Sequence, residues 1–277
     1  MPPDRAVVVN RFVVKIGSSV LTDAAGRLLT RRLEQFVRDV AACARARRAP
    51  VIVTSGAIAC GMAKLGLAQR PKALAQLQAC AAVGQGELMH AYTKAFGALG
   101  LTTAQVLLTQ DDLADRRRYR NARQTLLTLL HRRVIPIINE NDTVAVEEIT
   151  FGDNDRLAAL VAAAVDAQLL VLLSDVDGLL RDGRVVKRVG ALSKIPASII
   201  GRKARGTTRG GMASKLEAAR IVGHSGIPMV IANGARPAVL ADVLAGRSVG
   251  TFFAPPRRRL TAEQWWVAFS REVRHAG

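Results

Sequence analysis

Short aliphatic runs alternate with segments of helical periodicity along most of this 277-residue chain. The runs at 51–53, 135–138 and 169–173 consist of Val, Ile and Leu with a single Pro, which is typical of strands buried on both faces. Segment 30–48 instead places its apolar residues, from Leu33 to Ala44, at helical spacing. This alternation predicts an α/β fold, a three-layer α/β/α sandwich around a mostly parallel sheet.

The same patterns predict the individual elements. Strands are expected at Val7–Ile16, Val51–Val53, Ala104–Leu108, Ile135–Ile138, Leu169–Leu173, Met229–Ile231 and Thr251–Phe253. Helices are expected at Thr30–Arg48, Ala73–Leu99, Asp111–Arg133, Asp155–Val165, Met212–Ser225 and Ala238–Leu244, with Gly84 and Gly86 bending or splitting the second. Residues 144–149 fit an edge hairpin, and 175–209 form a polar insertion. We predict one domain over residues 1–256 and a tail over 257–277, because no repeat or flexible linker divides the chain.

The formal charge of +18 restricts the function little by itself. Cations gather at Arg116–Arg118, Arg120 and Arg123, where Tyr119 is the only ring, whereas binding of single-stranded nucleic acid normally uses interleaved aromatics. We therefore interpret these arginines as a solvated helix face or a subunit contact, and nucleic acid is not expected as a partner.

The cysteines and the longest apolar stretch indicate the cellular compartment. Cys43, Cys60 and Cys80 are odd in number and widely spaced, so they suggest neither a disulfide framework nor a metal site and favour a reducing cytoplasm. The most apolar stretch, Leu157–Leu173, is interrupted by Asp166, and residues 1–11 contain no targeting signal. No membrane association is expected.

An acidic segment, Asn139–Asp155, follows directly on the predicted strand at 135–138. It contains six carboxylates and no Lys or Arg, in a strongly basic chain. Strand ends in α/β sheets present polar groups to ligands. The segment therefore indicates recognition of an amine-bearing ligand or organisation of nearby cations.

Two other predicted strands end in small residues. Lys15 is followed by Gly17 and two serines, a turn that can hold phosphate against the ammonium and the backbone N–H groups. The second strand runs into Ser55 and Gly56, and Gly56 would let a ligand approach the backbone. Taken alone, each motif fits an ordinary turn before a helix equally well.

A second glycine-rich segment, 206–215, places Gly210 and Gly211 before a helix with Lys215 one turn inside. Its spacing is not that of a Walker A loop, but it makes an anion site at a helix start, with a plain capped loop as the alternative. Ser174 and Asp175 end a further strand. Four polar strand ends at one sheet edge together favour a ligand site more than any one of them does.

The four histidines, at 90, 131, 224 and 275, lie outside all these motifs. No histidine-based acid–base pair or triad is therefore supported, and no His/Cys/Asp spacing fits zinc. Two phosphate-facing lysines without a base suit phosphoryl transfer to a nucleophile that is already anionic, such as a carboxylate.

Five motifs carry a family resemblance. They are Val13–Ser19, Thr54–Ala59, Pro136–Asp142, Phe151–Asp155 and Gly210–Lys215, and together they resemble the glutamate 5-kinases of the amino-acid kinase family over residues 12–256. The resemblance implies the amino-acid kinase fold and transfer of the ATP γ-phosphoryl group to the γ-carboxylate of L-glutamate, the first step of proline biosynthesis. A sibling carboxylate or carbamate kinase, acting on an acceptor such as N-acetylglutamate or aspartate, is the alternative.

The resemblance also implies residue roles. Lys15 and Lys215 would stabilise the transferring phosphoryl group, and Asp155 would orient both lysines. The substrate-binding residues would be Ser55, Gly56, Asp142 and Asn154. The nucleotide-binding residues would be Lys15, Gly17, Ser174, Asp175, Arg209, Gly210, Gly211, Met212, Ala213, Ser214 and Lys215. Mg²⁺ would be held mainly by nucleotide phosphates and water, so no protein metal ligand is predicted.

The chain departs from the family pattern in three places. Many relatives continue into a C-terminal PUA domain, for which residues 257–277 are too short; the segment after Gly178 is shortened; and Arg209 replaces a common Thr. By resemblance, a homo-oligomer is expected, and the next enzyme of the proline pathway is a further expected partner.

Overall fold

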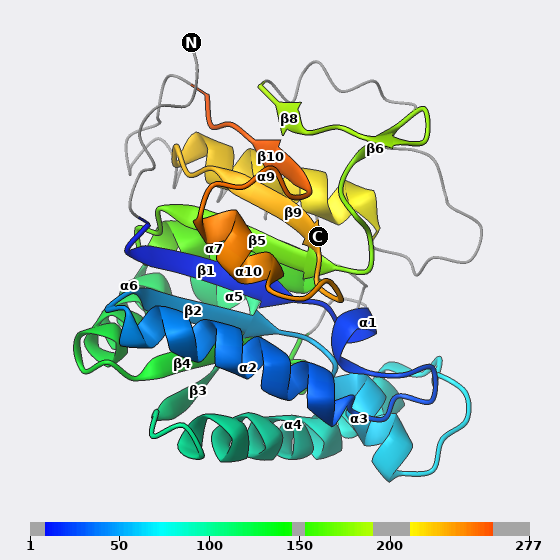
Figure 1. Cartoon of the computed structure of the whole chain (residues 1–277). Coiled ribbons are helices and arrows are strands. Elements are labelled where there is room, and N and C mark those ends of the chain that lie inside the picture. Colours follow the sequence, from blue (N-terminus) through cyan, green and yellow to red (C-terminus); the bar gives the residue numbers. More distant parts are fainter. Residues whose placement is uncertain (1–8, 146–152, 191–210, 257–277) are drawn as a thin grey trace.

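The computed structural model describes residues 9–145, 153–190 and 211–256 (Figure 1). Its main strands are β1 (Arg11–Ile16), β2 (Ala49–Thr54), β3 (Thr103–Leu108), β4 (Ile135–Glu140), β5 (Leu169–Ser174), β8 (Arg188–Val189), β9 (Met229–Asn233) and β10 (Thr251–Phe253). They form one eight-stranded sheet in the order β3-β4-β2-β1-β5-β9-β10-β8. All neighbours are parallel except β9 and β10, and a small hairpin of β6 (Leu180–Arg181) and β7 (Arg184–Val185) stands apart. The predicted mostly parallel sheet is confirmed.

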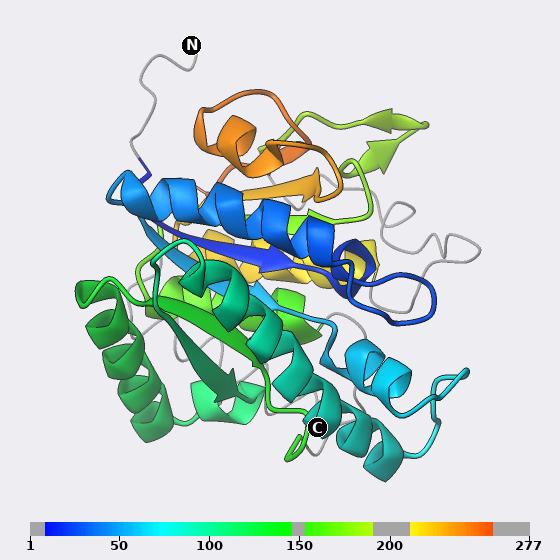
Figure 2. The ribbon, with the colours of Figure 1, turned by 60° about the horizontal axis from the view of Figure 1, so that its bottom comes forward.

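Helices cover both faces of this sheet (Figures 1 and 2). One face carries α1 (Ser18–Leu21), α2 (Thr30–Arg45), α4 (Leu74–Gly97) and α10 (Val239–Leu244); the other carries α5 (Gln110–Ala114), α6 (Arg116–His131), α7 (Asp153–Ala164) and α9 (Met212–His224). Each face has its own apolar core, so the three-layer sandwich is confirmed. Among the described helices, none combines the length and apolar character needed to cross a membrane.

The side chains of β1 alternate between the two cores. Phe12, Val14 and Ile16 join the core under α2 and α4, whereas Val13 joins the core under α7 and α9. Successive strand residues point to opposite faces, so Lys15 belongs to the side of α7 and α9. It lies one residue from the carboxyl end of the strand, which is the edge where open α/β sheets bind ligands.

The predicted splitting of the helix at Ala73–Leu99 is wrong, because α4 runs unbroken from Leu74 to Gly97. Gly84 serves a close helix contact instead: a Cβ there would lie 1.8 Å from the backbone oxygen of Ala57 in α3 (Ala57–Lys64). Gly61 of α3 meets α4 in the same way, with its Cβ position 1.8 Å from the oxygen of Cys80. The glycines therefore allow α3 and α4 to pack backbone against backbone.

The single helix predicted at Asp111–Arg133 is also wrong, because the structure has α5 and α6 there, separated at Asp115. The Asp115 carboxylate accepts hydrogen bonds from the backbone N–H groups of Arg117 and Arg118, at 3.0 and 2.8 Å. A side chain that caps a new helix in this way competes with continuation of the previous one. The predicted hairpin at 144–149 and the tail at 257–277 lie largely or wholly outside the described residues.

Candidate active site

Three charged side chains meet at the carboxyl edge of the sheet. Lys15 Nζ lies 2.7 Å from Asp155 Oδ1, and Lys215 Nζ lies 3.1 Å from Asp155 Oδ2. They come from the end of β1, the first turn of α7 and the first turn of α9. Their exposed fractions are 7% for Lys15, 1% for Asp155 and 8% for Lys215. Residues 200 positions apart in sequence are thus joined through one buried carboxylate.

Asp155 remains ionised in this setting. Burial on its own would raise its pKa, but the ammonium groups of Lys15 and Lys215 and a hydrogen bond from Ser214 act against burial, and the pKa is lowered overall. Ser214 Oγ donates to Asp155 Oδ2 at 2.8 Å. The group therefore has two positive charges and one negative charge, a net excess that suits a polyanion.

The start of α9 adds to this positive potential. Gly211, Met212, Ala213 and Ser214 form the end of the preceding loop and the first turn, where backbone N–H groups lack partners inside the helix. A helix N-terminus beside two ammonium groups favours phosphate binding. Arg209 and Gly210, predicted for the same loop, lie outside the described residues.

The remaining predicted nucleotide residues flank Lys15. Gly17 donates its N–H to the carbonyl of Leu173 at 3.0 Å, so this amide already has a partner. A Cβ at Gly17 would lie 3.8 Å from Lys15 Nζ, and a larger side chain would crowd that ammonium group. Ser174, at the end of neighbouring β5, donates through Oγ to Asp175 Oδ1 at 2.9 Å. These residues share one edge with the three charged side chains.

The predicted substrate residues lie around the ends of β2 and β4. Gly56, the N-cap residue of α3, has a left-handed conformation with φ of 108°, which a side chain would disfavour, and Ser55 precedes it. Asn154 Oδ1 accepts from the backbone N–H of Glu140 at 3.2 Å, which ties α7 to the end of β4. Asp142 follows in the turn after that strand.

Sequence reasoning missed side chains that reach this region from the α3–α4 connection and α4. Burial lowers the pKa of Arg70, and the carboxylate of Asp142 acts in the opposite direction, so the two side chains interact. Asn139 donates through Nδ2 to Gln85 Oε1 at 2.8 Å. Arg70 and Gln85 follow no local motif, and only the packing of α4 against the sheet brings Gln85 to β4.

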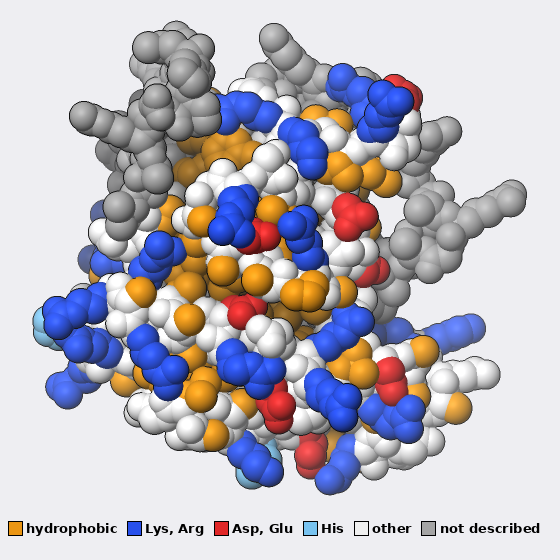
Figure 3. Space-filling view, viewed as in Figure 1, with side chains coloured by type: hydrophobic (Ala, Val, Ile, Leu, Met, Phe, Trp, Pro, Cys, Tyr) orange, Lys and Arg blue, Asp and Glu red, His pale blue; other side chains and the backbone are white. Residues whose placement is uncertain are grey.

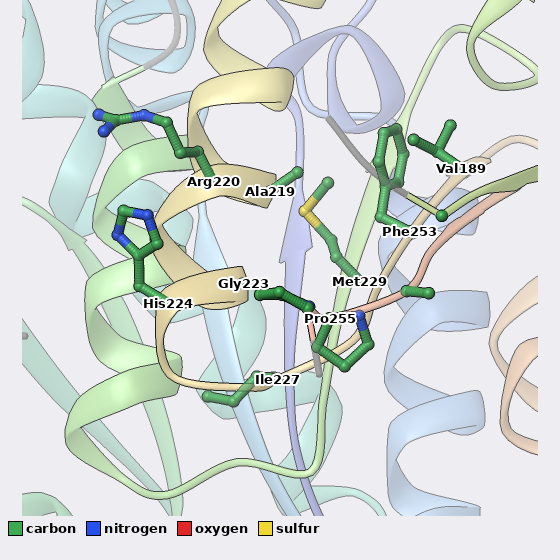
Figure 4. A pocket seen from close by; sticks show the side chains of 12 residues that line it. Val189, Ala219, Arg220, Gly223, His224, Ile227, Met229, Phe253 and Pro255 are labelled. Atoms are coloured by element: carbon green, nitrogen blue, oxygen red, sulfur yellow. The ribbon is translucent and has the colours of Figure 1, made fainter. Parts of the chain in front are cut away.

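A separate cavity of about 260 Å³ lies near the C-terminal end of α9, away from Lys215. Figure 4 shows Arg220 and His224 on one side of it and Val189 and Phe253 on the other. Its described lining residues are mainly apolar, and none of them is a carboxylate. It does not share the charge pattern of the site at the sheet edge.

Basic side chains are spread over the face that Figure 3 shows, with acidic side chains between them. Arg116, Arg117 and Arg120 of α6 are exposed, and their role stays a prediction.

Known proteins resemble this chain in sequence and in fold. Residues 10–233 match the family model described as "Amino acid kinase family". Glutamate 5-kinase of Caldanaerobacter subterraneus subsp. tengcongensis is 46% identical over 270 residues, covering 95% of this chain and 73% of the relative. Glutamate 5-kinase of Salinispora arenicola is 49% identical over 280 residues, covering 98% and 74%.

Two solved structures share the fold at low sequence identity. UMP kinase from Bacillus anthracis superimposes with a TM-score of 0.62 at 13% identity, over 89% of this chain and 96% of that chain. N-acetylglutamate synthase from Neisseria gonorrhoeae, complexed with coenzyme A and L-arginine, gives 0.65 at 16% identity over 89% of this chain. This chain spans 61% of the synthase chain.

Proposed function

Because the chain belongs to the amino acid kinase family and, within it, to the glutamate 5-kinases, we propose that it phosphorylates the γ-carboxylate of L-glutamate with ATP. The product is γ-glutamyl phosphate, and the reaction is the first step of proline biosynthesis. The observation that carries the proposal at the site is the convergence of Lys15 and Lys215 on buried Asp155.

The charges of this group suit phosphoryl transfer between anions. A glutamate γ-carboxylate, with an ordinary pKa of about 4.3, is ionised at neutral pH and needs no base to become a nucleophile. One of its oxygens forms the new bond to the γ-phosphorus while the bond to the bridging oxygen breaks and ADP leaves. Catalysis then depends on alignment and on neutralising charge at the phosphoryl group, which two ammonium groups provide.

We assign the roles as follows. Lys15 and Lys215 neutralise charge on the transferring group, and Asp155 orients both ammonium groups. Asp142 and Asn154, with the Ser55–Gly56 turn, hold glutamate; Asp142 fits the α-ammonium by charge. The start of α9 and Ser174–Asp175 line the nucleotide.

ATP is expected to bind as its magnesium complex. Within the described residues, no group of three or more His, Cys, Asp or Glu side chains could hold a metal ion. Because Mg²⁺ typically uses few protein ligands, we expect nucleotide phosphates and water to supply most of its ligands, and Asp175 is the carboxylate nearest to the proposed nucleotide side in sequence. The bound ion would neutralise charge on the phosphates.

A homo-oligomer in the cytoplasm is the setting we propose. Three buried cysteines without disulfides, at positions 43, 60 and 80, fit a reducing compartment. Large exposed hydrophobic side chains include Leu65, Leu67 and Leu74 along the α3–α4 connection, an apolar surface that a second copy would cover. Light scattering of purified protein tests the oligomer, and a strictly monomeric protein would contradict it.

An acceptor panel tests the proposed reaction. ADP release is measured with L-glutamate, N-acetylglutamate, aspartate and carbamate in turn, and hydroxylamine traps any acyl phosphate as a hydroxamate. We expect turnover and hydroxamate with glutamate. Turnover with another acceptor and none with glutamate would overturn the proposal in favour of a sibling kinase.

A further inference from the structure

Two buried side-chain amides face each other between α4 and β4. Asn139 Nδ2 donates to Gln85 Oε1 at 2.8 Å, and Asn139 is only 2% exposed. Among the residues that the structure describes, the other two amide atoms, Asn139 Oδ1 and Gln85 Nε2, are buried and have no hydrogen-bond partner. The pair thus leaves one acceptor and one donor unused, side by side.

These unused atoms need an explanation, because a buried polar group without a partner destabilises the folded protein. Turning both amides by half a rotation exchanges their roles but still leaves one donor and one acceptor. Such a pair complements a ligand that carries an acceptor and a donor close together. The α-carboxylate and α-ammonium of an amino acid are such groups.

The position of the pair fits the acceptor side of the site. Asn139 directly precedes Glu140, whose backbone N–H is held by Asn154, and it lies three residues before Asp142. On the face of the sheet toward α4, Asn139 follows Ile135 and Ile137, which pack in the apolar core there. Gln85 as a whole residue is partly exposed, although its Nε2 atom is buried, so the pair lies beneath a side chain that reaches the surface.

We propose that Gln85 is a substrate-recognition residue: it fixes the amide of Asn139, and the pair binds the α-ammonium and α-carboxylate of the acceptor. This inference rests on the proposed function and deepens it. An N-acyl group replaces the ammonium by a neutral amide with a single N–H and added bulk, so the pair favours free amino acids over N-acylated ones.

Gln85→Met keeps the length of the side chain and removes both hydrogen-bonding groups. We expect the KM for glutamate to rise roughly 10- to 100-fold, with kcat and the KM for ATP changed less than about threefold. Gln85→Glu keeps an acceptor for Asn139 but removes the donor and adds a negative charge. It should raise the KM for glutamate at least as much.

Gln35→Met is the matched control, because Gln35 is an exposed glutamine on α2 and should leave all constants unchanged. The rise in melting temperature that glutamate produces gives a readout without turnover, and it should shrink in the Gln85 variants only. A wild-type KM for glutamate in either Gln85 variant would overturn the inference. So would a variant in which kcat and both KM values worsen equally and in which the melting-temperature shifts produced by glutamate and by ATP shrink equally.

A wild-type protein without glutamate turnover would instead overturn the proposed function. The Gln85 inference is then decided by the glutamate-induced shift alone, and it fails if wild-type protein shows none.

Discussion

Replacing Asp155 by Asn removes one buried charge and leaves the shape of the side chain. In the folded protein, the carboxylate compensates two ammonium groups, at 2.7 and 3.1 Å, and is 1% exposed. Removing one partner of a buried ion pair typically costs about 3–5 kcal/mol, because the remaining charge stays buried and unpaired. Counted over their side chains alone, Lys15 and Lys215 are 9% and 10% exposed, so we expect a loss near the lower end, about 3 kcal/mol.

Urea denaturation at pH 7 measures this loss. The midpoint should fall while the slope m stays unchanged, because the surface exposed on unfolding is the same. ATP should then stabilise Asp155→Asn more than wild-type protein, since its phosphates replace the missing counter-charge. Turnover should nevertheless fall by about two orders of magnitude or more, because the ammonium groups are no longer aligned.

The matched control is Asp182→Asn, at an exposed aspartate with φ of 51°, where the change should stay within about 0.5 kcal/mol. If Asp155→Asn costs less than about 1 kcal/mol, or if ATP stabilises both proteins equally, the buried-charge reasoning is wrong.

The pH dependence follows from the lowered pKa of Asp155. A group whose pKa is lower in the folded protein contributes stability above its unfolded pKa, here about 3.9, and loses it as pH falls through the folded value. The difference in unfolding free energy between wild type and Asp155→Asn should therefore be constant from pH 7 to about 5 and shrink below about pH 4. A difference that shrinks already between pH 7 and 6 would contradict a lowered pKa.

Three other predictions concern catalysis, packing and thiol reactivity. Lys215→Ala should lower kcat by about two orders of magnitude or more, and wild-type turnover in steady-state assays would remove Lys215 from the mechanism. Gly84→Ala should lower the free energy of unfolding, measured by urea denaturation, by about 1–3 kcal/mol, because the added Cβ would lie 1.8 Å from a backbone oxygen of α3. Gly86→Ala, on the same helix with nothing within 4 Å, should be neutral or stabilising, and equal effects would contradict the packing argument. Burial, with a smaller effect of Glu87, raises the pKa of the Cys60 thiol to about 11. Iodoacetamide should therefore alkylate Cys60 at pH 8 at least about 100-fold more slowly in native than in unfolded protein, as peptide mass spectrometry would show.

The sheet was predictable because its strands are short aliphatic runs with helices between them. Lys15, Ser174 and the Asn139–Asp142 turn each end such a run, and parallel strands bring their carboxyl ends to one edge. The meeting of Lys15 with Lys215 at Asp155 was instead expected from the family resemblance, and the structure brings both lysines to that carboxylate. Their catalytic roles stay a prediction.

The misses have a common cause, since each depends on contacts that a local pattern does not contain. Gly84 looks like a helix breaker until α3 packs against it, and Asp115 looks like one more helical residue until its carboxylate caps α6. Gln85 pairs with a residue 54 positions away. No periodicity in α4 distinguishes this glutamine from its exposed neighbours.

The start of α7 connects the two halves of the site. Asn154 and Asp155 are consecutive, and successive helical residues point about 100° apart. Asn154 reaches the backbone of β4 on the acceptor side, whereas Asp155 reaches the lysines of β1 and α9. One turn of helix therefore fixes the distance between the proposed glutamate pocket and the ammonium groups that would receive the phosphates. In-line transfer requires such a fixed separation. A change that shifts this turn along its axis should therefore reduce kcat more than it weakens the binding of either substrate alone.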